Sequence, residues 1–185
     1  LSLHDALPIS TFIEAAEVKE IAPIMHPLSG RSLFDIFRSP KSGQVVASRD
    51  HVLIGKERHD IGRPNNWGYP IRGIIKNDQL YLRNFKPARW PSGHPTTGYL
   101  NCDGSPTKTT ILNQRRNGTY PFWKLNFGKR PSEELFDLKQ DSDCVNNLAE
   151  SKSHLRLKMK LKNQLLSELR EQGDPRMFGD GDIFD

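Results

Sequence analysis

IRGIIKNDQLYLRNF, residues 71–85, is the stretch of sequence that decides the fold. Two apolar-rich runs, 71–75 and 80–85, flank the polar sequence Lys76-Asn77-Asp78-Gln79. Two such runs joined by a few polar residues are typical of a β-hairpin. We therefore predict an antiparallel pair of strands at this point of the chain.

Further short strands are predicted on both sides of this hairpin. The segments with strand-like composition are 44–48, 52–54, 123–127 and 134–138, and Gly55 is expected to break the second of them. Residues 86–121 are rich in Pro, Gly, Thr and Asn without a sustained period. This composition predicts a long surface excursion rather than a core element.

The last long element is predicted to be an amphipathic helix. Its apolar stripe consists of Leu155, Leu157, Met159, Leu161, Leu165, Leu166 and Leu169. Gly173 should close this helix, and Pro175 should prevent it from resuming. Strands followed by one such helix predict an α+β unit, a small antiparallel sheet with a C-terminal amphipathic helix across one face. Upstream, residues 11–18 read as the end of a helix and 30–37 as a short helix or turn.

Composition narrows the range of functions. The 185 residues carry a net charge of +5, which is common for a plain surface and also suits an acidic polysaccharide. No apolar run approaches the ~20 residues of a membrane helix, so no membrane partner is expected. The sequence offers no zinc finger, recognition helix or basic-aromatic strand, so no nucleic-acid partner is expected. Cys102 and Cys144 lack the spacing of a zinc site and are either a disulfide or two free thiols.

The first nine residues, LSLHDALPI, do not read as a signal peptide or a natural start. One frame of a widely used sequencing adapter, CTT TCC CTA CAC GAC GCT CTT CCG ATC T, encodes the same nine residues. We therefore expect residues 1–9 to be translated adapter. The natural sequence would begin near Ser10, which makes 10–185 a single subdomain.

Residues 134–149, ELFDLKQDSDCVNNLA, are similar to the ELYDLxxDPxExxNLA segment near the end of many sulfatases. The chain departs from that pattern at Ser142 and Cys144. Leu135 and Leu138 would anchor a strand, whereas Asp141, Asn146 and Asn147 would cap backbone groups in the following turn. Upstream, TFIEAA (11–16) and GRSL (30–33) resemble the family's TxLEAAG and GRSL segments, in the same order.

Two shorter motifs, KERHD at 56–60 and YPIR at 69–72, resemble the heparan N-sulfatase (N-sulfoglucosamine sulfohydrolase) branch of that family. The resemblance implies substrate-binding residues in both motifs: His59, Arg72, Asp60, Arg58 and Tyr69. Arg72 would grip a sulfate or carboxylate with two hydrogen bonds, and His59 with Asp60 would bond sugar hydroxyls. The structural alternatives are a salt bridge for Arg72, a loop hydrogen bond for His59 and ordinary packing for Tyr69.

The resemblance also implies that this chain is the C-terminal subdomain of an alkaline-phosphatase-like α/β sulfatase. Such an enzyme hydrolyses sulfate esters or sulfamates of sulfated amino sugars or glycans, with calcium and a formylglycine nucleophile matured from Cys-x-Pro/Ala-x-Arg. Neither cysteine here lies in that motif. We therefore expect this chain to contain no catalytic residue and no metal ligand, and to be inactive without the N-terminal catalytic domain.

The partners implied by the resemblance are a sulfated saccharide and the missing catalytic domain, and the implied location is periplasmic or extracellular. A different class of function stays open from the residues alone. The aromatic and basic residues of the predicted loops also suit a standalone, non-catalytic carbohydrate-binding module. Such a module would bind glycan without any upstream catalytic sequence.

Overall fold

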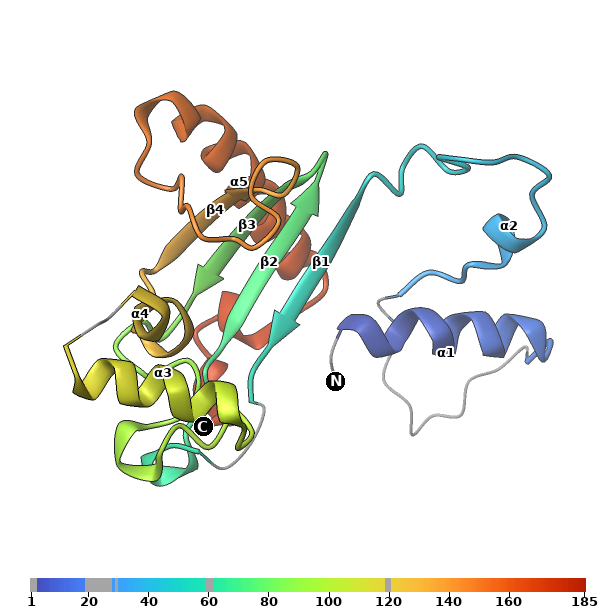
Figure 1. Ribbon diagram of the computed structural model, residues 1–185. Coiled ribbons are helices and arrows are strands. Elements are labelled where there is room, and N and C mark those ends of the chain that lie inside the picture. Colours follow the sequence, from blue (N-terminus) through green and yellow to red (C-terminus); the bar gives the residue numbers. More distant parts are fainter. Residues whose placement is uncertain (1–2, 19–27, 29, 59–61, 119–120) are drawn as a thin grey trace.

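The computed structural model of the chain describes residues 3–18, 28, 30–58, 62–118 and 121–185. Four strands form one antiparallel sheet in the order β1-β2-β3-β4 (Figure 1). Their bounds are β1 His51–Lys56, β2 Ile71–Lys76, β3 Gln79–Asn84 and β4 Glu133–Asp137. The helices are α1 Leu3–Ala15, α2 Phe34–Phe37, α3 Pro106–Arg116, α4 Pro121–Phe127 and α5 Leu155–Glu171.

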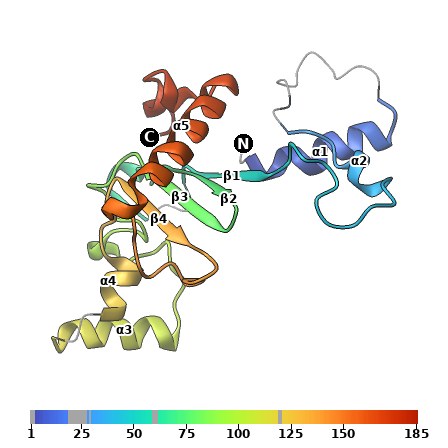
Figure 2. The same cartoon turned by 90° about the horizontal axis from the view of Figure 1, so that it is seen from above.

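Three groups of helices surround the sheet in different ways. Helix α5 lies across one face, α3 and α4 form a lobe at one end, and α1 with α2 makes an arm beside β1 (Figures 1 and 2). Short 3-10 helices lie at Pro64–Asn66, Pro95–Thr97, Lys152–His154, Pro175–Met177 and Gly181–Phe184. The predicted α+β architecture, a small antiparallel sheet with a C-terminal helix, is confirmed.

The hairpin of residues 71–85 is confirmed as β2 and β3. Lys76 faces Gln79 across the turn, and Ile74 faces Tyr81 further along the ladder. The turn residues Asn77 and Asp78 have φ angles of 50° and 58°, a left-handed conformation that Asn and Asp tolerate better than most residues. The two-residue turn therefore fixes the register of the central strand pair.

The core lies between α5 and one face of the sheet. A row of residues directly opposite one another crosses all four strands: Leu53, Ile74, Tyr81 and Leu135. This row packs against a buried ridge of α5 formed by Leu161, Leu165 and Leu169. The three leucines recur at helical spacing, so one stripe of the helix meets one face of the sheet.

The buried stripe of α5 differs from the predicted one at the start of the helix. Leu155 and Met159 are 53% and 44% exposed, whereas Lys158 is buried. The ammonium of Lys158 lies 3.5 Å from a carboxylate oxygen of Glu133, so the aliphatic stem packs inward while the charge meets a partner.

Several expected strands are wrong, each for a local reason. Residues 44–48 form turns, because the Gln44 amide donates to the Val46 and Arg49 carbonyls. Gly55 does not break β1 but lies within it. Residues 123–127 belong to helix α4, which sets Trp123 and Phe127 one turn apart on the same side of the helix. An alternating apolar run and one helical face share that i, i+4 spacing, which explains the misassignment.

The described residues of 86–121 are also more ordered than predicted, because they contain α3 and aromatic side chains that contact α4. Tyr99 is buried, and its ring centroid lies 4.7 Å from that of Phe127. Trp90 stands edge-on to Tyr99 and to Trp123, with both centroid distances at 6.2 Å. This segment and α4 thus form a second, small core of aromatic side chains.

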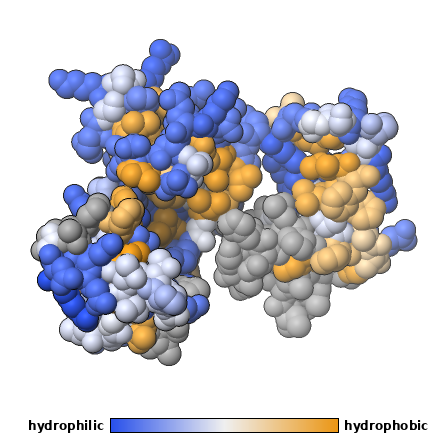
Figure 3. Space-filling view, in the orientation of Figure 1, coloured by the Kyte–Doolittle hydropathy of each residue, from blue (hydrophilic) through white to orange (hydrophobic). Residues whose placement is uncertain are grey.

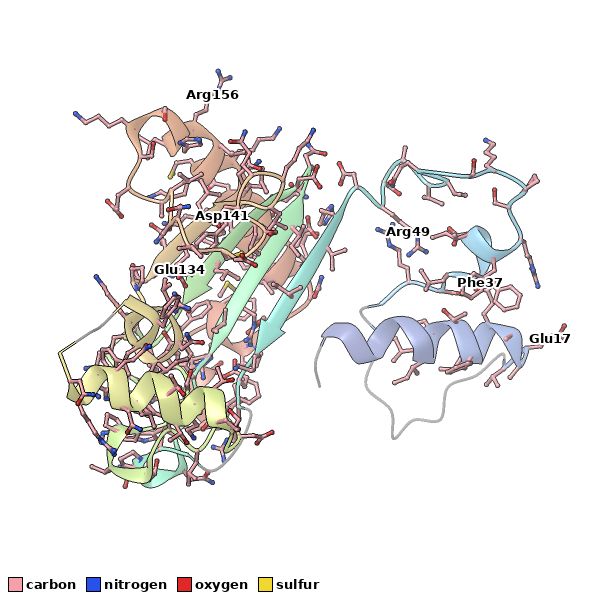
Figure 4. The ribbon with its side chains drawn as sticks, in the orientation of Figure 1. Glu17, Phe37, Arg49, Glu134, Asp141 and Arg156 are labelled. Atoms are coloured by element: carbon pink, nitrogen blue, oxygen red, sulfur yellow. The ribbon has the colours of Figure 1, made fainter. Side chains whose placement is uncertain are left out.

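Helix α1 runs continuously across the boundary at Ser10. The Ser10 hydroxyl donates to the Gly30 carbonyl at 2.8 Å, and the Leu33 amide donates to the Thr11 hydroxyl at 2.9 Å. Arg49 bonds the Ser32 carbonyl and Asp35 at the base of this arm (Figure 4). The predicted helices within 11–18 and 30–37 are therefore confirmed, and the adapter origin of residues 1–9 stays a prediction.

Replacement of Leu165 by Ala should lower the free energy of unfolding by about 2–5 kcal/mol, because Leu165 is fully buried in the core. Urea denaturation measures this change. Leu155→Ala is the matched control on the same helix and, being at a half-exposed position, should cost no more than about 0.5 kcal/mol. Equal losses in both variants would contradict the observed docking of α5.

Stability should fall as pH rises above about 6.5, the ordinary pKa of His51. Burial lowers the pKa of His51, but the hydrogen bonds that the protonated ring donates to Asp50 at 2.7 Å and Glu168 at 2.8 Å outweigh it and raise the pKa. The folded state then holds the proton more tightly, so this contribution is complete below the unfolded pKa and lost above the folded one. Urea denaturation at several pH values should show a shallower fall in His51→Asn, and an unchanged fall would refute the link.

Candidate functional site

The segment that resembles the sulfatase C-terminal motif builds β4 and the turn after it. Asp141 accepts hydrogen bonds from the Val145 and Asn146 amides at 3.0 and 2.7 Å. The Asn147 side-chain oxygen accepts from the amides of Leu135 and Ala149. The predicted capping roles of Asp141 and Asn147 are confirmed, whereas Asn146 contributes a backbone donor. These contacts hold the chain for its return into α5.

Arg58, Tyr69 and Arg72 lie at the end of the sheet where β1 finishes and β2 begins. Loops from the α3–α4 lobe and the C-terminus lie at this same end (Figure 1). Of the five predicted residues, Arg58, Tyr69 and Arg72 are described. His59 and Asp60 lie outside the described residues, so their predicted roles stay predictions.

Arg72 is buried, and its guanidinium joins three segments of the chain. Its Nε donates to Asp174 Oδ2 at 2.6 Å, and its Nη2 donates to Glu57 Oε1 at 2.6 Å. A further bond joins Nη1 to the Ile71 carbonyl at 3.0 Å. Burial opposes the charged form, but hydrogen bonds and charge from Asp174, followed by Glu57, outweigh it and raise the pKa of Arg72.

Sequence reasoning missed the partners that complete this cluster. Arg176 grips the second side of the Glu57 carboxylate, with Nη2 at 2.7 Å from Oε2. Asp174 also caps the short helix after it by accepting from the Arg176 amide at 2.9 Å. The signal was Gly-Asp-Pro-Arg at 173–176, read only as the end of α5. An acid before Pro-Arg, following a helix, marks a capped turn with a charge of each sign.

Tyr69 is buried to 1% exposure, and its amide donates to the Glu57 carbonyl at 2.7 Å. Burial raises the pKa of its hydroxyl to about 12. The Arg63 guanidinium lies 5.5 Å from the centre of the Tyr69 ring. Arg63 itself bonds the Trp90 and Pro91 carbonyls, both at 2.6 Å, which fastens the 86–104 loops to this end of the sheet.

A second cluster joins loop residues to the C-terminal segment. Arg58 is exposed and donates to the Phe184 carbonyl at 3.2 Å. Arg89 forms two hydrogen bonds with the Asp185 carboxylate, at 2.5 and 2.8 Å. The same guanidinium lies 5.0 Å from the centre of the Trp67 ring. Sequence reasoning predicted Arg58 to bind substrate but did not select Arg89 or Asp185.

This arrangement of guanidiniums and aromatic rings is suited to binding. The residues that the structure describes include no group of three His, Cys, Asp or Glu side chains placed to hold a metal ion. Cys102 and Cys144 are both free thiols. No described helix is long and apolar enough to cross a membrane. What the loops offer is guanidinium donors beside an aromatic ring, a combination that recognises anions and sugars.

A separate cavity of about 790 Å³ lies between α5 and the start of the arm. Its walls include Leu28, Arg31, His51 and Glu168. Of the predicted substrate-binding residues that the structure describes, Arg58, Tyr69 and Arg72, none lines this cavity.

Comparison with known proteins finds a shared fold at low sequence identity. Neither a protein-family model nor a curated protein matches the chain. Among solved structures, BT4656 in complex with its substrate D-glucosamine-2-N,6-O-disulfate matches over 90% of this chain, with a TM-score of 0.50 and 14% identity. The match covers 24% of the BT4656 chain, so this chain spans about a quarter of that protein.

Two other solved structures are similar to smaller degrees. A proposed sulfatase of Bacteroides thetaiotaomicron matches with a TM-score of 0.44, and BT1596, a 2-O GAG sulfatase, with 0.45. Both are 15% identical to this chain, and each match covers 90% of this chain and 24% of the other. The fold of this chain is therefore that of a part of BT4656, a protein solved with a sulfated glucosamine.

Proposed function

We propose that this chain is the C-terminal part of a sulfatase that hydrolyses sulfate esters or sulfamates of sulfated amino sugars or glycans. The observation that carries the proposal is the fold shared with a quarter of a protein whose substrate is a disulfated glucosamine. The sulfatase-like motif at 134–149 supports it independently, because its Asp141 and Asn147 make the capping contacts expected of a structural signature.

In this proposal the chemistry belongs to the remainder of the protein. Calcium and a formylglycine nucleophile there would polarise the sulfate and attack it. This chain would supply packing and the substrate-recognition loops at the end of the sheet. A periplasmic or extracellular location follows from the same family resemblance.

An apolar surface supports a missing partner domain. The face of the sheet turned away from α5 carries Val52, which is 51% exposed, and the half-buried Ile54 and Ile75. Apolar side chains gather over β1 and β2 in the space-filling view (Figure 3). An apolar face of this kind is typical of a surface that is covered in a larger protein.

Within the recognition loops we propose two kinds of role for the predicted residues. Arg58, which is exposed, would contact substrate directly, together with His59 and Asp60. Arg72 and Tyr69 would act as positioning residues, because Arg72 is committed to Glu57 and Asp174 and the side chain of Tyr69 is buried. Both contact Glu57, which directly follows β1.

The proposal is tested by reading the gene upstream of Ser10 and assaying the intact protein. A Cys-x-Pro/Ala-x-Arg segment and release of sulfate from N- or O-sulfated glucosamine are the expected results. A complete short gene without that segment would contradict the proposal. The chain would then be a standalone carbohydrate-binding module, provided that it binds glycan.

Arg72→Gln should destabilise the chain by about 3 kcal/mol, because it removes the buried cation that the half-buried carboxylates of Glu57 and Asp174 share. Urea denaturation gives the loss. Arg83→Gln is the matched control, since Arg83 lies directly opposite Arg72 on β3 and should cost less than about 1 kcal/mol. Full stability of Arg72→Gln with lost sugar binding would instead identify Arg72 as a direct contact.

A further inference from the structure

The C-terminal segment, residues 180–185, folds back onto the recognition loops and meets them with opposite charge. The Asp185 carboxylate receives two hydrogen bonds from Arg89, and Asp182 lies 3.0 Å from the Lys86 ammonium. The Phe184 carbonyl accepts from Arg58 at 3.2 Å. A segment about a hundred positions away in sequence thus places carboxylates on two loop cations and a carbonyl oxygen on a third.

The contact between Arg89 and Asp185 has the form of a ligand contact. Two parallel N–H donors of a guanidinium match two oxygens of a carboxylate, and they match two oxygens of a sulfate equally well. Trp67 lies beside this guanidinium and is 39% exposed, so part of its ring is open to solvent. An exposed indole next to an anion-binding fork suits a sugar ring that carries a sulfate.

The positive charge at this point extends beyond the contacts themselves. Burial lowers the pKa of Arg63, and the nearby charges of Arg89 and Arg58 lower it further. Three guanidiniums therefore lie close enough to influence one another. Such a concentration of positive charge attracts anions beyond the one that Asp185 supplies.

The segment that covers this site leaves part of its apolar surface open to solvent. Ile183 is 70% exposed, and Phe178 just before the segment is 59% exposed. Phe184 is half-buried, with the Arg176 guanidinium 5.8 Å from the centre of its ring. Gly179, with a φ of 88°, gives the backbone freedom where the segment begins. Release of residues 180–185 would leave the core between α5 and the sheet intact.

We propose that Arg58, Arg89 and Trp67 form a binding site for a sulfated sugar, and that the Asp185 carboxylate occupies this site in competition with the ligand. The proposal rests on the proposed function. It adds the residues that bind the sulfate and the segment that competes with the ligand for them. Sulfate replaces the carboxylate on Arg89, the sugar ring lies against Trp67, and residues 180–185 move aside.

Calorimetric titration of the 185-residue chain with D-glucosamine-2-N,6-O-disulfate tests this site. Asp185→Asn should tighten binding about tenfold, because an amide competes for the Arg89 fork less well than a carboxylate. Asp180→Asn is the matched control. It removes the same charge from the same segment, at an exposed side chain with no hydrogen bond or ion pair to another described residue, and should leave the affinity unchanged. Arg89→Gln should abolish binding, and Trp67→Ala should weaken it about tenfold.

Unchanged or weaker binding by Asp185→Asn, with a thermal melting curve like that of the parent chain, would overturn the competition. So would equal tightening by Asp180→Asn, which would point to net charge alone. Unsulfated glucosamine should not bind, and equal binding of it would overturn the role of sulfate. Failure here with sulfate release by the intact protein would remove only this site, whereas a missing nucleophile motif upstream would remove the proposed function.

Discussion

The buried ion-pair cluster around Arg72 is the constraint on which the functional end of the molecule depends. Arg72 starts β2, Glu57 follows β1, and Asp174 follows α5, so one guanidinium joins the sheet to the helix that covers it. A buried cation left without its carboxylates would be strongly destabilising. The three segments must therefore be assembled together, and the loops between them take their positions from that assembly.

The cluster also explains a residue that is unexpected in a strand. Gly55 lies directly opposite Arg72 in the β1–β2 ladder. A Cβ at position 55 would come within 3.0 Å of Arg72 Cδ, so the glycine gives the long side chain room to cross β1. Glycine weakens a strand intrinsically, but here it permits a close approach that the ion pairs require. The strand continues through Gly55 because tertiary contacts outweigh local preference.

The sequence predicted those elements whose pattern has a single physical reading. The hairpin at 71–85, the helix from Leu155 and the capped turn at Asp141 each combine periodicity with appropriate turn or cap residues. Residues 123–127 were ambiguous, since apolar residues at i and i+4 fit both a strand face and a helix face. The aromatic core around Tyr99 could not be predicted from the sequence, because its members are far apart in sequence and only the fold brings them together.

The candidate site, like the fold, could be predicted from the sequence only in part. The family-like motif at 69–72 led to Arg72, yet the identity of its partners depends on the return of the chain after α5, which no local pattern reveals. Arg89 and Asp185 are single charges in segments without periodicity, so only their proximity gives them meaning. Arg72 and Arg89 both hold carboxylates, but Arg72 joins the sheet to the chain that leaves α5, whereas Arg89 holds an acid on residues 180–185, which lie outside the core between α5 and the sheet. The first pairing therefore supports the fold, and the second is placed where a ligand could exchange with it.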